Sequence, residues 1–226
     1  LTNAMMTSHH PSTFKLLADG SVLVEGENIR SDIYTVTSTA NSLSGIRLEV
    51  LPDDSLPSKG PGRAENGNFV LTNLQVLVRQ VGTDGEFTPI KIGRATADFS
   101  QNNWEVAKAI NENQDDGWAV SPEIGKRHVA VFQLDDVISF ETGVEFQVVL
   151  HQKYETGATH NIGRFRLTTT DFDGVLALEG TPGNVLEAIA ADPRNDEQNK
   201  VLLDYYKHID ESYKQLVQAE KEHESK

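Results

Sequence analysis

Short runs in which every second residue is hydrophobic recur along the chain from about residue 14 to residue 170. This period of two is typical of a β-strand with one buried face. It is clearest at residues 46–50, where Arg47 and Glu49 alternate with three aliphatic residues. Residues 128–134 (HVAVFQL) are almost wholly apolar and predict a buried strand. Further strands are predicted at residues 14–17, 21–24, 33–37, 74–78, 144–150 and 163–168.

The longest interruption of this pattern lies between the strands predicted at residues 46–50 and 74–78. Its three prolines exclude a helix, and Asn66-Gly67-Asn68 predicts a tight turn. A loop of this length in a compact domain is usually functional or ordered by what it binds. Two interpretations of Asn66 and Asn68 stay open. Their amides complete the hydrogen bonds of the turn, or they join Asp53 or Asp54 as oxygen ligands of a hard cation such as Ca²⁺.

After residue 170 the apolar residues take helical spacing, as in the series Val201, Leu202, Tyr205, Tyr206 and Ile209. Asn195 or Asp196 is expected to cap that helix, and Asp210 a following one. We therefore expect a disordered lead-in at residues 1–12, a β-sandwich binding module at 13–172, and a helical hairpin or connector at 173–226. Many short strands with turn signals, and no alternation of strands with helices, predict an all-β fold. The expected architecture is an antiparallel jelly-roll β-sandwich with a C-terminal helical extension.

The charge balance of the chain limits the classes of partner that it can bind. The chain has 34 acidic and 20 basic residues and a formal net charge of −14, which disfavours nucleic acid because phosphate contacts need clustered Lys and Arg. No apolar run approaches the roughly 20 residues of a membrane span. Cysteine is absent, so this chain has no disulfide, no thiolate metal site and no covalently attached haem.

Catalytic signatures are also missing from the sequence. It contains no nucleophile elbow of the G-x-S-x-G type, no H-E-x-x-H and no P-loop. The acidic pairs Asp53-Asp54, Asp115-Asp116 and Asp135-Asp136 are adjacent in sequence, and in extended backbone adjacent side chains point to opposite faces. They are poor acid–base pairs, and we predict a non-catalytic protein.

Several stretches resemble a module of large planctomycete-type multidomain c-type cytochrome proteins. They are LEVLPDDSLPSKGPGRAENGNFVLT, GWAV, HVAVFQL and HNIGRFRLTTT, and the resemblance covers about residues 14–170. The later stretch DEQNKVLLDYYKHID looks like the helical connector of the same proteins. The resemblance implies that neighbouring domains of a parent protein are partners. It also implies an extracytoplasmic location, periplasmic or at the cell surface, because the haem domains of such parents need export.

A second similarity concerns Ala109-Ile110-Asn111 followed by Gly117-Trp118. It is similar to a stretch of discoidin-like, galactose-binding-type jelly rolls that reads alanine, isoleucine, aspartate, glycine and later tryptophan. Such modules often bind carbohydrate and often hold a structural calcium ion beside this stretch. Here Asn111 stands where the pattern has aspartate and Glu112 where it has glycine. The resemblance makes Asn111, Asp115 and Asp116 candidate calcium ligands.

Sugar recognition needs an aromatic surface for the C–H face of the ring and planar polar groups for its hydroxyls. A hairpin between the strands at 144–150 and 163–168 would bring residues 151–152 and 160–164 to one rim of the sandwich. The candidate glycan-binding residues are Trp104, Trp118, His128, His151, Gln152, Tyr154, His160, Arg164 and Arg166.

Two functions therefore stay open. The first is a carbohydrate-binding module that holds a polysaccharide or other glycan at this rim. The alternative is a structural or protein-interaction spacer between haem and other domains, with no glycan site. In that alternative Trp118 belongs to the core and Arg164 pairs with a carboxylate on a solvated face. An open groove lined by tryptophan and histidine favours binding, and a sandwich whose aromatic side chains are all interior favours the spacer.

Overall fold

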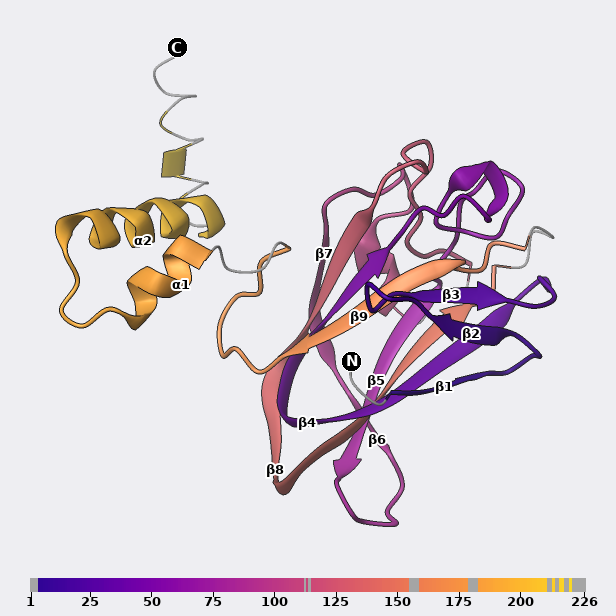
Figure 1. Cartoon of the computed structure of the whole chain (residues 1–226), viewed down its shortest axis with the longest axis horizontal. Coiled ribbons are helices and arrows are strands. Elements are labelled where there is room, and N and C mark those ends of the chain that lie inside the picture. Colours follow the sequence, from indigo (N-terminus) through magenta and orange to yellow (C-terminus); the bar gives the residue numbers. More distant parts are fainter. Residues whose placement is uncertain are drawn as a thin grey trace. The chain divides into compact units, whose positions relative to one another are not determined.

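The computed structural model describes residues 4–111, 113, 115–154, 159–178 and 183–210, with positions 213, 216, 217 and 220. The chain divides into two compact units, Leu1–Leu178 and Glu179–Lys226. The first is an antiparallel β-structure and the second is helical (Figure 1).

Every strand in the described residues of the first unit belongs to one nine-stranded antiparallel sheet, which confirms the predicted all-β class. Its strand order is β2-β3-β9-β4-β8-β5-β6, with β1 paired to β4 and β7 paired to β8. The strands are β1 (Met5–Ser8), β2 (Thr13–Leu16), β3 (Val22–Glu25), β4 (Asp32–Val50), β5 (Asn73–Gln80), β6 (Thr88–Ile90), β7 (Ile92–Ala97), β8 (His128–Gln152) and β9 (Arg164–Thr170). Two short 3₁₀ turns, η1 (Pro57–Lys59) and η2 (Val106–Ile110), lie in the loops.

The long strands β4 and β8 run antiparallel along their length (Figure 1), and each joins what the sequence pattern predicts as two strands. Their register shifts between Ala40 and Ser42 and again between Leu43 and Gly45. Such bulges bend a strand. They divide the sheet into two arms. The first arm contains β2, β3, β9 and β7 with residues 45–50 and 128–134, and the second contains β1, β5 and β6 with residues 32–40 and 144–152.

One hydrophobic core includes side chains from both arms, so the arms enclose it as the layers of a sandwich do. Tyr34 of β4 stacks on Phe165 of β9 with ring centroids 6.2 Å apart. The Tyr34 hydroxyl also donates to the carbonyl of Ile162 at 3.1 Å. Trp118 and Phe69 are fully buried in the same core, with their ring centroids 5.2 Å apart.

The lead-in predicted to be disordered contributes a strand, and this part of the prediction is wrong. Residues of β1 pair with β4 from Met5 opposite Thr37 to Ser8 opposite Tyr34. The Ser8 hydroxyl is 2.6 Å from a carboxylate oxygen of the buried Asp32. A four-residue edge strand takes its stability from the ladder it joins, so its own sequence shows no strand pattern.

The first unit also extends past residue 172, the predicted boundary. Residues 171–178 stay attached to it through hydrogen bonds of three side chains. The Ser44 hydroxyl donates to the Phe172 carbonyl at 2.9 Å. Gln133 Nε2 donates to the Gly174 carbonyl at 3.0 Å. Arg47 Nε donates to the Leu178 carbonyl at 3.0 Å.

The second unit contains α1 (Gly183–Ala190) and α2 (Asp196–Ile209), which contact each other. Asn195 caps α2 as predicted, in a reciprocal capping box with Gln198. Asp210 accepts the backbone N–H of Tyr213 at 2.6 Å. Within the described residues, no helix is long and apolar enough to cross a membrane.

Candidate functional site

Three aromatic side chains from three separate segments meet at the surface of the first unit. The ring of Tyr154 lies edge-on to Trp104, with centroids 5.0 Å apart, and edge-on to His160, with centroids 5.4 Å apart. Each of the three is partly exposed. We call Trp104, Tyr154 and His160 the aromatic rim. All three belong to the set that the sequence selected.

The turn that carries Trp104 is held by the long loop. The Trp104 N–H donates to the carbonyl of Gln101 at 2.8 Å. Asn68, which is 4% exposed, donates from Nδ2 to Gln101 Oε1 at 3.0 Å and accepts the Val120 N–H at 3.1 Å. Asn68 is therefore a positioning residue for the rim.

Tyr154 and His160 are held from the other side by the ends of two strands. Gln152, the last residue of β8, accepts the N–H of Ile162 through its side-chain oxygen. The His160 carbonyl accepts the N–H of Val70 at 3.0 Å. The end of β8 and the segment before β9 therefore lie together. The predicted hairpin is nevertheless wrong, because β9 pairs with β3 and β4 and the strand β4 separates it from β8. His151 is also partly exposed, and its Nε2 lies 3.2 Å from Gln75 Oε1.

Three other selected residues are interior, which corrects their assignment to a surface patch. Trp118 is fully buried and donates from Nε1 to the Phe99 carbonyl at 3.0 Å. His128 is 3% exposed, with Nε2 2.8 Å from the Glu123 carbonyl, and Gln152 is 1% exposed. Each has a backbone group as a partner, and His128 Nδ1 also lies 3.3 Å from a carboxylate oxygen of Asp98. No pattern within one strand identifies such partners.

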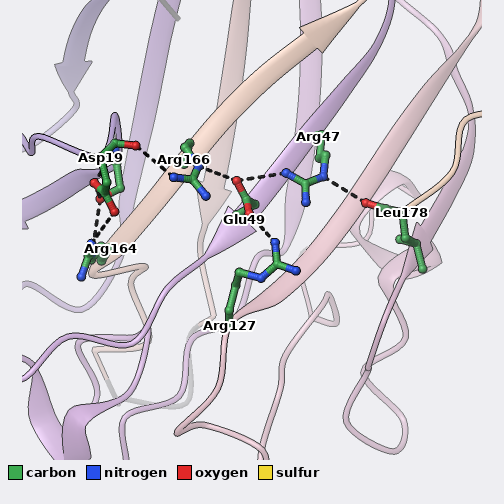
Figure 2. Close-up of polar contacts among 8 residues, drawn as sticks. Asp19, Arg47, Glu49, Arg127, Arg164, Arg166 and Leu178 are labelled. Atoms are coloured by element: carbon green, nitrogen blue, oxygen red, sulfur yellow. Dashed lines mark hydrogen bonds and ion pairs between the residues drawn. The ribbon is translucent and has the colours of Figure 1, made fainter. Parts of the chain in front are cut away.

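Arg164 and Arg166 are already paired with acidic groups of the same face (Figure 2). Arg164 contacts Asp19 at 2.8 Å and Asp53 at 3.1 Å. Arg166 Nε contacts Glu49 at 2.5 Å, and its Nη1 donates to the Asp19 carbonyl at 2.9 Å. The pairing of Arg164 with carboxylates is the alternative that the sequence left open.

Glu49 is the centre of this arrangement, which we call the Glu49 network: Glu49 with Arg47, Arg127 and Arg166 (Figure 2). The Glu49 side chain is 2% exposed and lies 3.0 Å from Arg47 and 2.7 Å from Arg127. Burial alone would raise the pKa of Glu49. The hydrogen bonds from Arg166 and Arg127 and the charge of Arg47 outweigh burial and lower that pKa to about 2.

The amides proposed as calcium ligands make internal hydrogen bonds. Asn66 Oδ1 accepts the Asn68 N–H at 3.0 Å, and Asn111 Oδ1 accepts the Asn113 N–H at 2.9 Å. Asn111 Nδ2 is 3.3 Å from both carboxylate oxygens of Asp116. In the described part of the chain, no three His, Cys, Asp or Glu side chains gather as metal ligands. The two calcium sites predicted from the sequence, one at Asn66 and Asn68 and the other at Asn111, Asp115 and Asp116, therefore stay predictions.

Sequence reasoning missed the residues that support the site. Gln75 and Gln101 stand in ordinary polar positions, and nothing local marks them as partners of His151 and Asn68. The sequence does show that Arg47 and Glu49 share one face of their strand, and that Arg164 and Arg166 share one face of theirs. What joins them is the register of β4 on β9, which places Glu49 opposite Arg166.

In comparisons with protein-family models, curated proteins and solved structures, no match to this chain was found, so the two resemblances noted in its sequence stay predictions.

Proposed function

We propose that the first unit is a non-catalytic carbohydrate-binding module that holds a glycan at the aromatic rim. The observation that supports this is the contact between three partly exposed aromatic rings at one place on the surface. Partly exposed rings can pack on the C–H face of a sugar, and the imidazole of His160 adds a polar group beside the two other rings. Such a combination of apolar surface with a few polar groups is what binding sites use.

The finer features of the proposal come from the resemblances. We assign the sandwich-like sheet to the jelly-roll, galactose-binding-like type. We place the chain in a larger, haem-bearing parent protein outside the cytoplasm, with neighbouring domains of that parent as partners of the helical unit.

Replacing Trp104 with alanine is expected to weaken glycan binding about tenfold or more, since loss of one aromatic contact of this kind is worth roughly 1.4 kcal/mol. Tyr154→Ala should have a similar effect, because Tyr154 contacts both other rings. The measurement is calorimetric titration with the best ligand from a glycan array.

Phe140→Ala is the matched control, since Phe140 is an aromatic residue of β8 that is 38% exposed and does not belong to the rim. It should bind like the wild type. Equal affinity of all four proteins would remove the aromatic rim as the site.

The spacer function keeps one observation in its favour. Trp118 is interior, and Arg164 and Arg166 are committed to carboxylates, so fewer of the selected side chains face solvent than a broad binding patch needs. A glycan array on which the folded wild type binds nothing would favour the spacer.

Calcium is expected to leave thermal unfolding unchanged. The oxygens of Asn66, Asn68 and Asn111 each accept a backbone N–H, and a ligand that binds only the native state would raise the unfolding temperature. The measurement compares thermal unfolding in calcium with that in EDTA. A clear rise in calcium would contradict this expectation and support calcium binding at one of the two sites predicted from the sequence.

A further inference from the structure

The first unit contains a cavity that no residue of the aromatic rim lines. It has a volume of about 350 Å³ and lies where the end of β3 meets the long loop. A volume of this size falls at the lower end of the range for pockets that hold small molecules. The residues of β3 and of the long loop's first half that line it are Leu23, Val24, Glu25, Ser55, Leu56 and Pro57.

Most of this lining is aliphatic. Leu23 and Val24 are 8% and 3% exposed, and Leu56 and Pro57 add two further apolar side chains. Leu56 is packed against backbone, since a Cβ on Gly163 would lie 2.5 Å from its Cδ1. Among the described residues that line the cavity, none is aromatic. A sugar ring therefore finds no aromatic surface here, and the lining suits a short aliphatic chain.

The Ser55 hydroxyl offers this cavity an acceptor and no donor. Its proton goes to Asp53 Oδ1 at 2.6 Å, and the Ser55 backbone N–H donates to the same oxygen at 2.9 Å. Asp53 is held in turn by Arg164 at 3.1 Å. The hydroxyl is thus fixed in orientation, and the capacity left on its oxygen is for accepting a hydrogen bond.

Glu25 adds a carboxylate, which also accepts only. Its side chain is 50% exposed, and it lies 3.8 Å from the ammonium group of Lys15, which is 60% exposed. This distance is longer than that of a hydrogen bond between the two groups. The Glu25 oxygens can therefore accept hydrogen bonds from another cation.

The two lining residues that carry side-chain N–H groups direct them into the protein. Asn28 Nδ2 donates to the carbonyls of Arg63 at 2.7 Å and Thr159 at 3.3 Å. Arg63 Nη2 donates to the Gly26 carbonyl at 2.5 Å. Burial raises the pKa of Tyr34 to about 12, and hydrogen bonding from Arg63 acts in the opposite direction. Because Tyr34 belongs to the core, the Arg63 guanidinium is directed inward.

We propose that this cavity binds a small aliphatic amine in its ammonium form. The alkyl chain packs on Leu23 and Leu56, and the ammonium group donates to the Glu25 carboxylate. Ser55 Oγ is a second acceptor of the same cavity. An ammonium group has three donors and no acceptor, which matches a lining that offers acceptors and a negative charge. A carboxylate or phosphate ligand would instead meet the charge of Glu25.

Titration of the full-length protein with butylammonium tests the proposal. In a spectrum of labelled Leu and Val methyl groups, the signals of Leu23, Val24 and Leu56 should move and saturate. Butyrate, with a similar chain and the opposite charge, should leave them in place. The Trp104 indole signal should also stay in place, since the rim does not line this cavity. Absence of saturable movement with butylammonium, or equal affinity for butyrate, would overturn the proposal.

Glu25→Gln supplies the test of the charged group. It should bind butylammonium about fivefold more weakly than the wild type, as expected for loss of a half-exposed ion pair. Glu27→Gln is the matched control, because Glu27 is an exposed residue two positions along that does not line the cavity. The titrations are made in 0.15 M salt, which screens the net charge of −14. Equal affinity of Glu25→Gln and the wild type, or equal weakening in both variants, would contradict binding at Glu25.

Discussion

Replacing Glu49 with glutamine is expected to lower the free energy of unfolding at pH 7 by about 3 kcal/mol, at the low end for breaking a buried ion pair. The Glu49 side chain is 2% exposed and contacts guanidinium groups from its own strand β4, from the neighbouring strand β9 and from the segment before β8. The amide removes the charge that these groups share. Partial solvent access of Arg127, which is 40% exposed, limits the loss. The measurement is urea unfolding.

Asp135→Asn is the matched control for this prediction. Asp135 pairs with Lys91 at 2.7 Å, but the two side chains are 41% and 80% exposed. An exposed pair is worth about 0–1 kcal/mol, so the control should unfold close to the wild type. Equal losses in both variants would show that Glu49 makes no special contribution.

The same variant should change how stability depends on pH. The pKa of Glu49 is about 2 when folded against an ordinary value of 4.5, so the unfolded chain binds the proton more readily. Its contribution is therefore complete above pH 4.5 and is lost as pH falls toward 2. Asp19, whose pKa is also lowered to about 2 by hydrogen bonds from Ser21, acts in the same direction. The stability curve of Glu49→Gln should accordingly be flatter than that of the wild type in this window.

Replacing Gly62 with alanine is expected to destabilise the protein by about 3 kcal/mol, the upper range for forcing extra atoms into packed structure. A Cβ at this position would lie 1.9 Å from the Asn68 carbonyl oxygen and 2.7 Å from the Phe69 nitrogen. Both are backbone atoms, so no side-chain rotation relieves the clash. Because Asn68 positions the turn of Trp104, glycan affinity should fall as well.

Gly125→Ala is the control, since nothing lies within 4 Å of a Cβ there. It should unfold within about 0.5 kcal/mol of the wild type, as surface substitutions usually do. If Gly62→Ala behaved like Gly125→Ala, the long loop would not pack as closely as described.

The sequence predicts the β-class because alternation is a local property. It also predicts the cap of α2, since Asn195 and Gln198 have the spacing of a capping box. It misses the continuity of β4 and β8, because the small and polar residues between Ser38 and Gly45 show no alternation although their backbone stays paired. β1 is missed for a related reason, since its partner β4 is far away in the chain.

For the candidate site, the sequence identifies residues of the right chemical type, but it does not show which of their side chains are buried. Trp104 and Trp118 look alike in the sequence, yet only Trp104 is partly exposed. Whether an aromatic side chain faces the core or the solvent depends on strand pairing between distant segments, and a one-residue shift reverses it. The ion pairs of Arg164 and Arg166 depend on the same register.

The two tryptophans offer the most direct test of glycan binding at the aromatic rim. They supply the only two indole N–H signals in a ¹⁵N–¹H correlation spectrum, and the Trp118 indole donates to the Phe99 carbonyl inside the core. During titration with a glycan that binds, the Trp104 signal should move with saturation while the Trp118 signal stays in place. A saturating glycan that leaves the Trp104 signal unmoved would contradict the proposed site.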